Sequence, residues 1–328
     1  MQISQDNGLR PATFDDFIGQ PELKERLQVA VESAKIRNCP VDHILLTGSP
    51  GLGKTTLAAI IAAERGVNLH TLIGPAIDGM NAIYQVFAVI QPGDVIFIDE
   101  IHGIKREIEE QLYMAMEEFK IAFTYNGQPT RISAVDPFTL IGATTQPGKL
   151  SNPLLSRFTV RERVEYYDKD DLKRIVERSS GILGYECSDR AAMEIASRCR
   201  GTPRIANNLL RRVRDYAIVK YQSANLTCEI ASRSLTLRGV DADGLNELDL
   251  RTLETIITKF GGGPVGVHSL SVAVSDDEGT LANIVEPYLI QHGYMQRTRL
   301  GRIATDLAYR KLNLEPAKDE TVIDLMKP

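Results

Sequence analysis

The segment from Gly48 to Thr55 (GSPGLGKT) constrains the fold of this chain more than any other, because three glycines, a lysine and a threonine stand at fixed spacing. It fits the pattern G-x-x-x-x-G-K-[ST], follows an apolar run at 43–47 and precedes a helical pattern at 57–63. Between a strand and a helix, such a loop lets backbone N–H groups approach phosphate oxygens at a helix N-terminus, which favours anions. We therefore predict a nucleotide site, with Lys54 along the β- and γ-phosphates and Thr55 as a ligand of Mg²⁺.

A second apolar run, 95–98, ends in two carboxylates, Asp99 and Glu100. Two acids at a strand end can simply cap a helix, but hydrolysis of a nucleotide needs both a metal-binding carboxylate and a group that positions water. Because Asp99 and Glu100 follow a phosphate loop in the same chain, we favour a catalytic role for them over helix capping. We expect Asp99 to hold Mg²⁺ and Glu100 to polarise the attacking water, so that ATP is hydrolysed and not merely bound.

The 328 residues exceed what one hydrophobic core usually supports, which is about 250 to 300 residues. Apolar runs alternate with helical patterns from 41 to about 167, which predicts an α/β domain with a mostly parallel sheet over 1–167. Over 168–240 apolar residues recur at helical spacing, which indicates a small all-helical domain. After a polar, Gly-containing stretch, 241–328 shows helices and then a hairpin-like segment, as in a winged helix.

The net charge is −5, with 38 Lys and Arg against 43 Asp and Glu. A surface that is basic overall is therefore excluded, and any contact with nucleic acid must be local. The N-terminus has no signal-peptide pattern, and no apolar run approaches the ~20 residues that span a bilayer. We expect a cytoplasmic protein.

Three further stretches resemble the AAA+ ATPases: Asp99–His102 (DEIH), Ile141–Thr145 (IGATT) and Gly201–Asn207 (GTPRIAN). Within that class the chain resembles the RuvB family, the bacterial motors that drive branch migration of Holliday junctions in recombination and DNA repair. The resemblance is most specific at 48–56, 200–217 and 286–297, and extends over about 9–312. It implies an α/β AAA+ P-loop core, a helical lid, a C-terminal winged helix and a homohexameric ring that encircles duplex DNA.

The resemblance also implies roles for single residues. Thr144 would sense the γ-phosphate from a strand end, Arg204 would sense it from the lid, and Arg157 would be an arginine finger that reaches the neighbouring subunit's site. From spacing alone, Arg157 could equally form a surface salt bridge, and Arg204 could be a charge on a helix face. The nucleotide-binding residues that the resemblance implies are Leu9, Arg10, Gly51, Gly53, Lys54, Thr55, Thr56, Tyr167 and Arg204.

The segment 297–302 (RTRLGR) places three arginines around a turn that contains glycine. Turn-borne arginines suit phosphate contacts, which position a protein on DNA without reading its sequence. In the RuvB family the wing grips duplex DNA, and the resemblance implies Arg297 and Arg302 as the contacts. A second basic run, made up of Arg211, Arg212, Arg214 and Lys220, is left unassigned, because helical domains often carry solvated basic faces.

The segment 120–134 (KIAFTYNGQPTRISA) contains a strong hairpin-turn signal at 125–127. The resemblance identifies it with the hairpin that docks on RuvA, here through Ile121, Phe123 and Tyr125, although core packing would explain the same apolar residues. RuvC would join as part of a resolvasome.

The sequence departs from the family pattern in four places. Gly103-Ile104 replaces Arg-Leu after the histidine, and Leu155 replaces an arginine before the finger, so the subunit interface is expected to differ. The hairpin is about three residues shorter than usual. The acidic stretch 276–278 stands where relatives tend to have a basic residue, which should weaken phosphate binding.

Three other functions compete with this interpretation. A clamp loader or replication-initiation ATPase would not need junction DNA for turnover. A winged-helix regulator would use ATP only as a ligand, and the pairing of Glu100 with Arg157 disfavours it. A protein unfoldase would seldom need a C-terminal winged helix.

Overall fold

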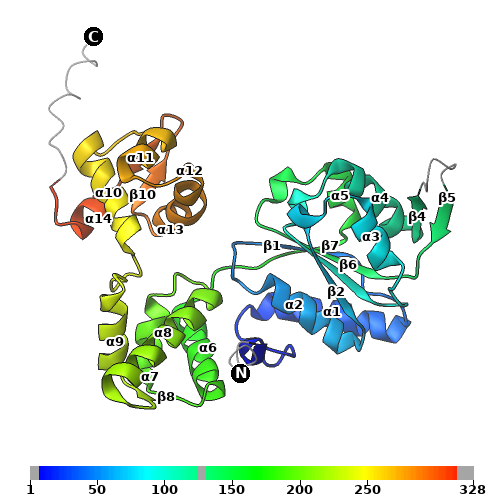
Figure 1. Ribbon diagram of the computed structural model, residues 1–328, viewed down its shortest axis with the longest axis horizontal. Helices are drawn as coiled ribbons and strands as arrows, with labels where there is room; N and C mark the ends of the chain where they lie inside the picture. The colour runs from blue at the N-terminus through cyan, green and yellow to red at the C-terminus, as the bar shows by residue number, and fades with distance from the viewer. Residues whose placement is uncertain (1–6, 124–130, 316–328) are drawn as a thin grey trace, which may run out of the picture. The chain divides into compact units, whose positions relative to one another are not determined.

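A computed structural model describes residues 7–123 and 131–315 of the chain. Contacts between Cα atoms divide it into two compact units, which meet in the sequence at 230 and 231 (Figure 1). Within the described residues, no helix is both long enough and apolar enough to cross a membrane.

A five-stranded sheet with entirely parallel pairing forms the centre of the first unit, as predicted. The strand order is β2-β3-β6-β1-β7. The three middle strands are buried almost throughout, which explains their continuous apolar sequences. The strands are β1 (Ile44–Thr47), β2 (Leu69–Ile73), β3 (Val95–Asp99), β6 (Thr139–Thr144) and β7 (Val160–Arg163).

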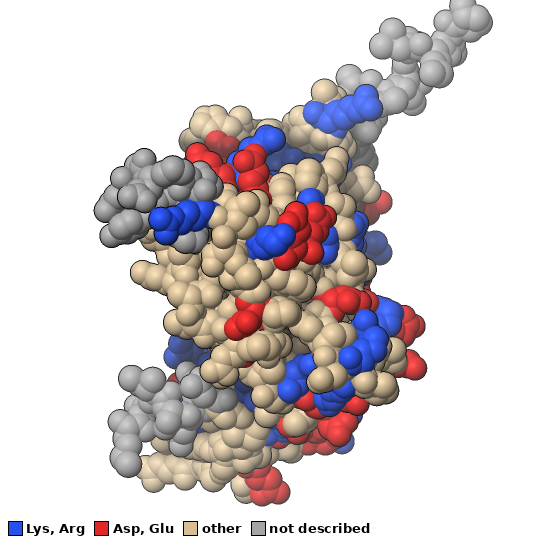
Figure 2. All heavy atoms as spheres, turned by 90° about the vertical axis from the view of Figure 1, so that its right-hand side faces the viewer, with Lys and Arg blue, Asp and Glu red and all other residues tan. Residues whose placement is uncertain are grey.

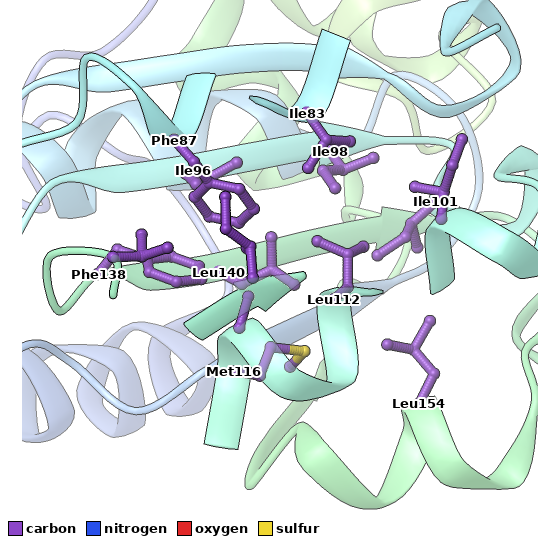
Figure 3. Close-up of a cluster of buried hydrophobic side chains, with 14 of the residues drawn as sticks. Ile83, Phe87, Ile96, Ile98, Ile101, Leu112, Met116, Phe138, Leu140 and Leu154 are labelled. Atoms are coloured by element: carbon purple, nitrogen blue, oxygen red, sulfur yellow. The ribbon is translucent and has the colours of Figure 1, made fainter. Parts of the chain in front are cut away.

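Helices cover both faces of this sheet (Figure 1). α1 (Pro21–Arg37) and α2 (Lys54–Arg65) lie on one face, and α3 (Met80–Phe87), α4 (Arg106–Glu118) and α5 (Asn152–Arg157) lie on the other. Figure 3 shows how α3 and α4 bury Phe87 and Leu112 against Ile96 and Leu140 of the sheet. Short 3₁₀ turns complete the domain: η1 (Asn7–Leu9), η2 (Gly74–Ala76), η3 (Ile101–Gly103) and η4 (Pro147–Lys149).

The predicted hairpin is formed by β4 (Lys120–Phe123) and β5 (Arg131–Ala134), with Ile121 opposite Ser133. Ile121 is only 8% exposed and belongs to the core of the sheet domain. This burial corrects the expectation that its side chain forms part of a docking edge. Ile132 of β5, in contrast, is 66% exposed. The side chain of Phe123 and all of Tyr125 lie outside the described residues, so the prediction for them stands as it was.

The lid consists of α6 (Lys169–Ile182), α7 (Asp189–Ser197), α8 (Pro203–Tyr221) and α9 (Cys228–Leu237). Side chains cap three of these helices: Asp168 accepts a hydrogen bond from the backbone of Asp171, Ser188 accepts one from Ala191, and Thr227 accepts one from Ile230. The sequence patterns did not predict the one strand pair here, β8 (Glu186–Cys187) with β9 (Asn225–Leu226). Two residues per strand are too few for a periodic signal.

The second unit contains the predicted winged helix. α10 (Glu247–Phe260) begins with a capping box between Asn246 and Asp249. The wing is the antiparallel pair β10 (Met295–Arg297) and β11 (Arg302–Ala304). The remaining elements are α11 (Val267–Val274), α12 (Glu278–Thr280), the π-helical turn η5 (Leu281–Val285), α13 (Glu286–Gln291) and α14 (Asp306–Lys311).

The buried carboxylate of Asp94 ties the start of β2 to the start of β3. It accepts hydrogen bonds from the backbone of Asn68 and Gln91 and contacts His70 Nε2 at 2.8 Å, and it is only 2% exposed. Burial acts to raise the pKa of Asp94, but the bonds from His70, Gln91 and Asn68 outweigh it and hold the pKa below its ordinary value of 3.8.

We predict that Asp94→Ala destabilises the chain by about 2 to 3 kcal/mol at pH 7, because it leaves buried donors without an acceptor. Because the folded pKa lies below the unfolded one, this stabilisation is complete above pH 3.8 and is lost as the pH falls below it. Urea unfolding at pH 7 and pH 3 should show the difference between wild type and variant shrinking in acid. Asp136→Ala, at an exposed position, is the control and should leave the free energy of unfolding unchanged at both pH values. A difference between wild type and Asp94→Ala that does not depend on pH would contradict the stabilising role of the ionised Asp94.

Candidate active site and nucleic-acid interface

The loop between β1 and α2 curls around the ammonium group of Lys54. Its Nζ donates hydrogen bonds to the carbonyl oxygens of Gly48, at 2.7 Å, and Ser49, at 3.0 Å, and the side chain is buried. Such a tight curl brings the backbone into the left-handed region at Gly51, where φ is 80°. The loop thereby points its N–H groups inward at the N-terminus of α2, as a phosphate site requires.

Charges of both signs meet beside the loop. Burial lowers the pKa of Lys54, the carboxylates of Glu100 and Asp99 act in the opposite direction, and Arg204 lowers it further. All four side chains therefore lie close enough to affect one another across the same space. A phosphate chain placed there would lie close to the two cations. The two carboxylates beside it could bind a metal ion and orient a water molecule.

This space is a cavity of about 390 Å³, within the range of small-molecule pockets. The structure brings together at its wall every residue expected to bind nucleotide: Leu9, Arg10, Gly51, Gly53, Lys54, Thr55, Thr56, Tyr167 and Arg204, with Asp99 and Glu100 beside them. Phe17, Ile18 and Ile175 add apolar wall that could face a base. A nucleotide triphosphate fits this arrangement in size and charge.

Two contacts bind the cavity's rim together. The buried hydroxyl of Tyr167 donates to the carbonyl oxygen of Leu52, within the phosphate loop, at 3.1 Å, and burial raises the pKa of the phenol. Arg178 of α6 donates to the Leu9 carbonyl oxygen at 2.9 Å. The sequence analysis did not find Arg178, because nothing in the local pattern shows that α6 lies beside the N-terminal segment.

The lid contributes one face of α8. The backbone N–H of Arg204 donates to the Gly51 carbonyl oxygen at 3.3 Å, so the helix begins against the phosphate loop. Arg204, Asn207, Asn208 and Arg211 recur at helical spacing and all line the cavity. Arg211, unassigned from the sequence, thus belongs to the site, whereas its neighbour Arg214 pairs with Asp215 at 2.8 Å.

At the end of β6 the structure corrects one expectation. Thr144 is fully buried, and its Oγ1 lies 3.0 Å from His102 Nδ1 and accepts a bond from the backbone of Gln146. Its hydroxyl therefore cannot touch a γ-phosphate directly. The next residue, Thr145, is partly exposed and donates to Glu100 Oε2 at 3.2 Å. Alternation along a strand does not reveal which of two adjacent hydroxyls is enclosed, and the role of γ-phosphate sensor stays a prediction.

Arg157 makes its contacts within its own chain and does not line the cavity described above. It pairs with Glu117 at 3.0 Å, donates to the Pro153 carbonyl oxygen at 2.7 Å, and lies over the ring of Tyr113, 4.5 Å from its centre. The salt bridge that was the alternative for this residue is therefore present. A role in a neighbouring site requires a second copy of the chain and stays a prediction.

In the winged helix, Arg302 is 8% exposed and makes two bonds to Glu286, which is 2% exposed. This buried pair corrects the expectation that Arg302 contacts DNA, since its guanidinium group is paired with Glu286 inside the domain. Arg297 and Arg299 are exposed on the wing. On the face shown in Figure 2, basic and acidic residues of the described chain are interspersed, and neither sign of charge covers it alone.

Family models match the chain in three consecutive segments. The model of the Holliday junction DNA helicase RuvB P-loop domain matches 9–164, and the model of the RuvB AAA lid domain matches 167–241. The model of the RuvB C-terminal winged helix domain matches 242–313.

Solved structures agree along the whole length. The RuvB Holliday junction branch migration motor of Thermotoga maritima is 42% identical, with a TM-score of 0.84, and the match covers 94% of this chain and 99% of that chain. Two mutants of the same RuvB match with TM-scores of 0.85 and 0.86, at the same identity and coverage.

The chain belongs to the RuvB family.

Membership in the RuvB family explains the constellation in the cavity. The protein is an ATP-hydrolysing DNA translocase, built from a P-loop core, an AAA lid and a winged helix. The phosphate loop and the two carboxylates come from the core, and the lid adds its arginines.

Close packing of α8 on the phosphate loop leads to a first prediction for this site. A Cβ atom on Gly51 would lie 2.9 Å from Arg204 Cβ, whereas one on Gly66, which also has positive φ, would meet nothing within 4 Å. Both Gly51→Ala and Gly66→Ala should cost about 1 kcal/mol of stability. Only Gly51→Ala should also weaken ATP binding, by about tenfold, because it displaces the lid. Titration with a fluorescent ATP analogue would test this, and equal affinities in the two variants would contradict it.

The buried pair of Arg302 and Glu286 in the winged helix leads to a second prediction. Arg302→Ala should destabilise that unit by about 3 to 5 kcal/mol, because Glu286 would remain as a buried, unpaired charge. Arg297→Ala should leave the melting temperature unchanged and lower the affinity for duplex DNA. Calorimetry with DNA titration separates the two. If Arg302→Ala kept full stability and lost only DNA affinity, our correction would be wrong.

Proposed function

We propose that this protein drives branch migration of Holliday junctions in recombination and DNA repair, as a ring that draws duplex DNA by ATP hydrolysis. The observation that carries the proposal is the single cavity in which the phosphate loop, two carboxylates and the lid arginines meet, in a chain that also has a winged helix. Solved structures with the same three parts include one named as a branch migration motor.

ATP binding would begin at Lys54. Its ammonium group now donates to the carbonyl oxygens of Gly48 and Ser49, and phosphate oxygens would replace these acceptors. Arg204 would reach the same phosphates from the lid, drawing α8 towards the core. Glu100 would orient the attacking water, and the lid would move again when the γ-phosphate leaves.

Thr55 and Asp99 would hold Mg²⁺, and both line the cavity. A threonine and one carboxylate suit Mg²⁺, which typically binds through one or two protein oxygens and the substrate's phosphates. When bound, the ion would neutralise charge that develops on those phosphates.

Arg157 would complete the neighbouring subunit's site in a homohexamer. Its contacts with Glu117 and Tyr113 hold it at the surface with about a fifth of the side chain exposed, so it can exchange these partners for a phosphate. Arginines supplied in this way accelerate related hydrolases by about 10³ to 10⁵. Assembly would then be a condition of activity.

The wing would hold duplex DNA through Arg297. The acidic stretch 276–278 of the same unit already makes contacts of its own, because Asp277 caps α12 by accepting a hydrogen bond from the Thr280 backbone and Glu278 lies 2.7 Å from His268. Its negative charge still lies in the same unit and should weaken the binding of phosphate.

RuvA would dock on the hairpin of β4 and β5, with RuvC as a further partner in a resolvasome. The exposed Ile132, opposite Ala122 in that hairpin, offers an apolar contact that the buried Ile121 does not. A motor that acts on chromosomal junctions would work in the cytoplasm. A clamp-loader or replication-associated role is less favoured, because all three domains match RuvB models.

The proposal predicts that the purified protein separates the strands of a synthetic four-way junction in the presence of Mg²⁺, ATP and the RuvA from the same genome. Lys54→Ala should abolish both migration and hydrolysis, and Glu100→Gln should keep ATP binding while losing turnover. Migration rates and phosphate release would be measured together. If the protein hydrolysed ATP but moved no junction, with or without RuvA, it would be an ATPase with another function. If Glu100→Gln still moved junctions, ATP hydrolysis would not drive migration and the proposal would be wrong.

A further inference from the structure

His102 is shared between the ends of two neighbouring strands. It lies in η3, directly after β3, and its Nδ1 is 3.1 Å from Glu100 Oε2 and 3.0 Å from Thr144 Oγ1 at the end of β6. Its side chain is 14% exposed, and the described residues that line the cavity include Glu100 but not His102. The imidazole therefore stands behind the glutamate and not beside the nucleotide.

The two neighbours of Nδ1 favour one tautomer of the ring. The carboxylate of Glu100 can only accept hydrogen bonds when ionised and Thr144 Oγ1 can also accept one, so we assign the proton to Nδ1. In this tautomer the N–H faces the oxygens of both Thr144 and Glu100. Because Thr144 is fully buried and also accepts a bond from the backbone of Gln146, it fixes the ring from the rear.

The carboxylate of Glu100 is held at one oxygen. Oε2 accepts hydrogen bonds from the Thr145 hydroxyl at 3.2 Å and the Thr145 backbone at 3.4 Å, and His102 Nδ1 lies 3.1 Å from the same oxygen. The backbone of Glu100 is also constrained, in the left-handed region with φ 48° and ψ 48°. A Cβ atom on Gly74 would lie 2.3 Å from the Glu100 carbonyl oxygen, so η2 packs directly against it.

We propose that His102 is a positioning residue for ATP hydrolysis. Its Nδ1–H, steered by the Thr144 hydroxyl, ties Oε2 of Glu100 to the end of β6 and so sets the direction in which the other carboxylate oxygen faces water. Thr144 acts on the reaction through this histidine. The inference concerns the hydrolysis of ATP, so it can hold or fail independently of junction migration.

The test is steady-state ATP hydrolysis by the assembled protein with duplex DNA, alongside the affinity for a fluorescent ATP analogue. His102→Ala should lower kcat by about tenfold or more, since a small displacement of a catalytic group is costly. Nucleotide affinity should change by less than about twofold, because the interaction acts on the transition state. His102→Asn, which keeps an N–H near the position of Nδ1, should recover part of the loss, and Thr144→Ser should be more active than Thr144→Val.

His70 provides a matched control, because it also contacts a carboxylate, that of Asp94, away from the cavity. His70→Ala should lower the melting temperature and leave kcat unchanged. Combining His102→Ala with Glu100→Gln separates a positioning role from general disruption of the active site. In the Glu100→Gln background, His102→Ala should lower the remaining kcat by less than about twofold. Multiplicative losses, a loss that lies mainly in nucleotide affinity, or an equal fall of kcat in His70→Ala would overturn the proposal.

Discussion

The placement of one ammonium group, that of Lys54, organises the active site. Its bonds to Gly48 and Ser49 close the phosphate loop at the carboxyl edge of the sheet. Because all five strands run in the same direction, Asp99 and the end of β6 reach that edge as well. The buried cation would be unfavourable without nearby carboxylates, and Glu100 and Asp99 offset part of its desolvation.

Much of this arrangement could be predicted from the sequence, because its determinants are local. Glycine spacing, a continuous apolar strand and an acid pair at a strand end each report on a few neighbouring residues, and a parallel sheet brings them together. The middle strands and the winged helix were predictable for the same reason. The resemblance to RuvB supplied positions such as Leu9 and Tyr167, which no local pattern indicates.

The expectations that needed correction all concern burial. Arg302 and Ile121 carry side chains that suit a surface contact, yet both face an interior, where Glu286 neutralises the first and the sheet's core surrounds the second. Thr144 and Thr145 are adjacent hydroxyls, and only the fold shows which is enclosed. Arg178 and Arg211 were not recognised because they approach the cavity on lid helices that are remote in sequence from the phosphate loop.

The bond between Arg178 and the carbonyl oxygen of Leu9 fastens the N-terminal segment to the lid. A nucleotide in the cavity would then touch three stretches of the chain at once: the phosphate loop, the lid helices and the N-terminal segment that Arg178 holds. Its binding would act as a cross-link between parts of the protein that are far apart in the sequence.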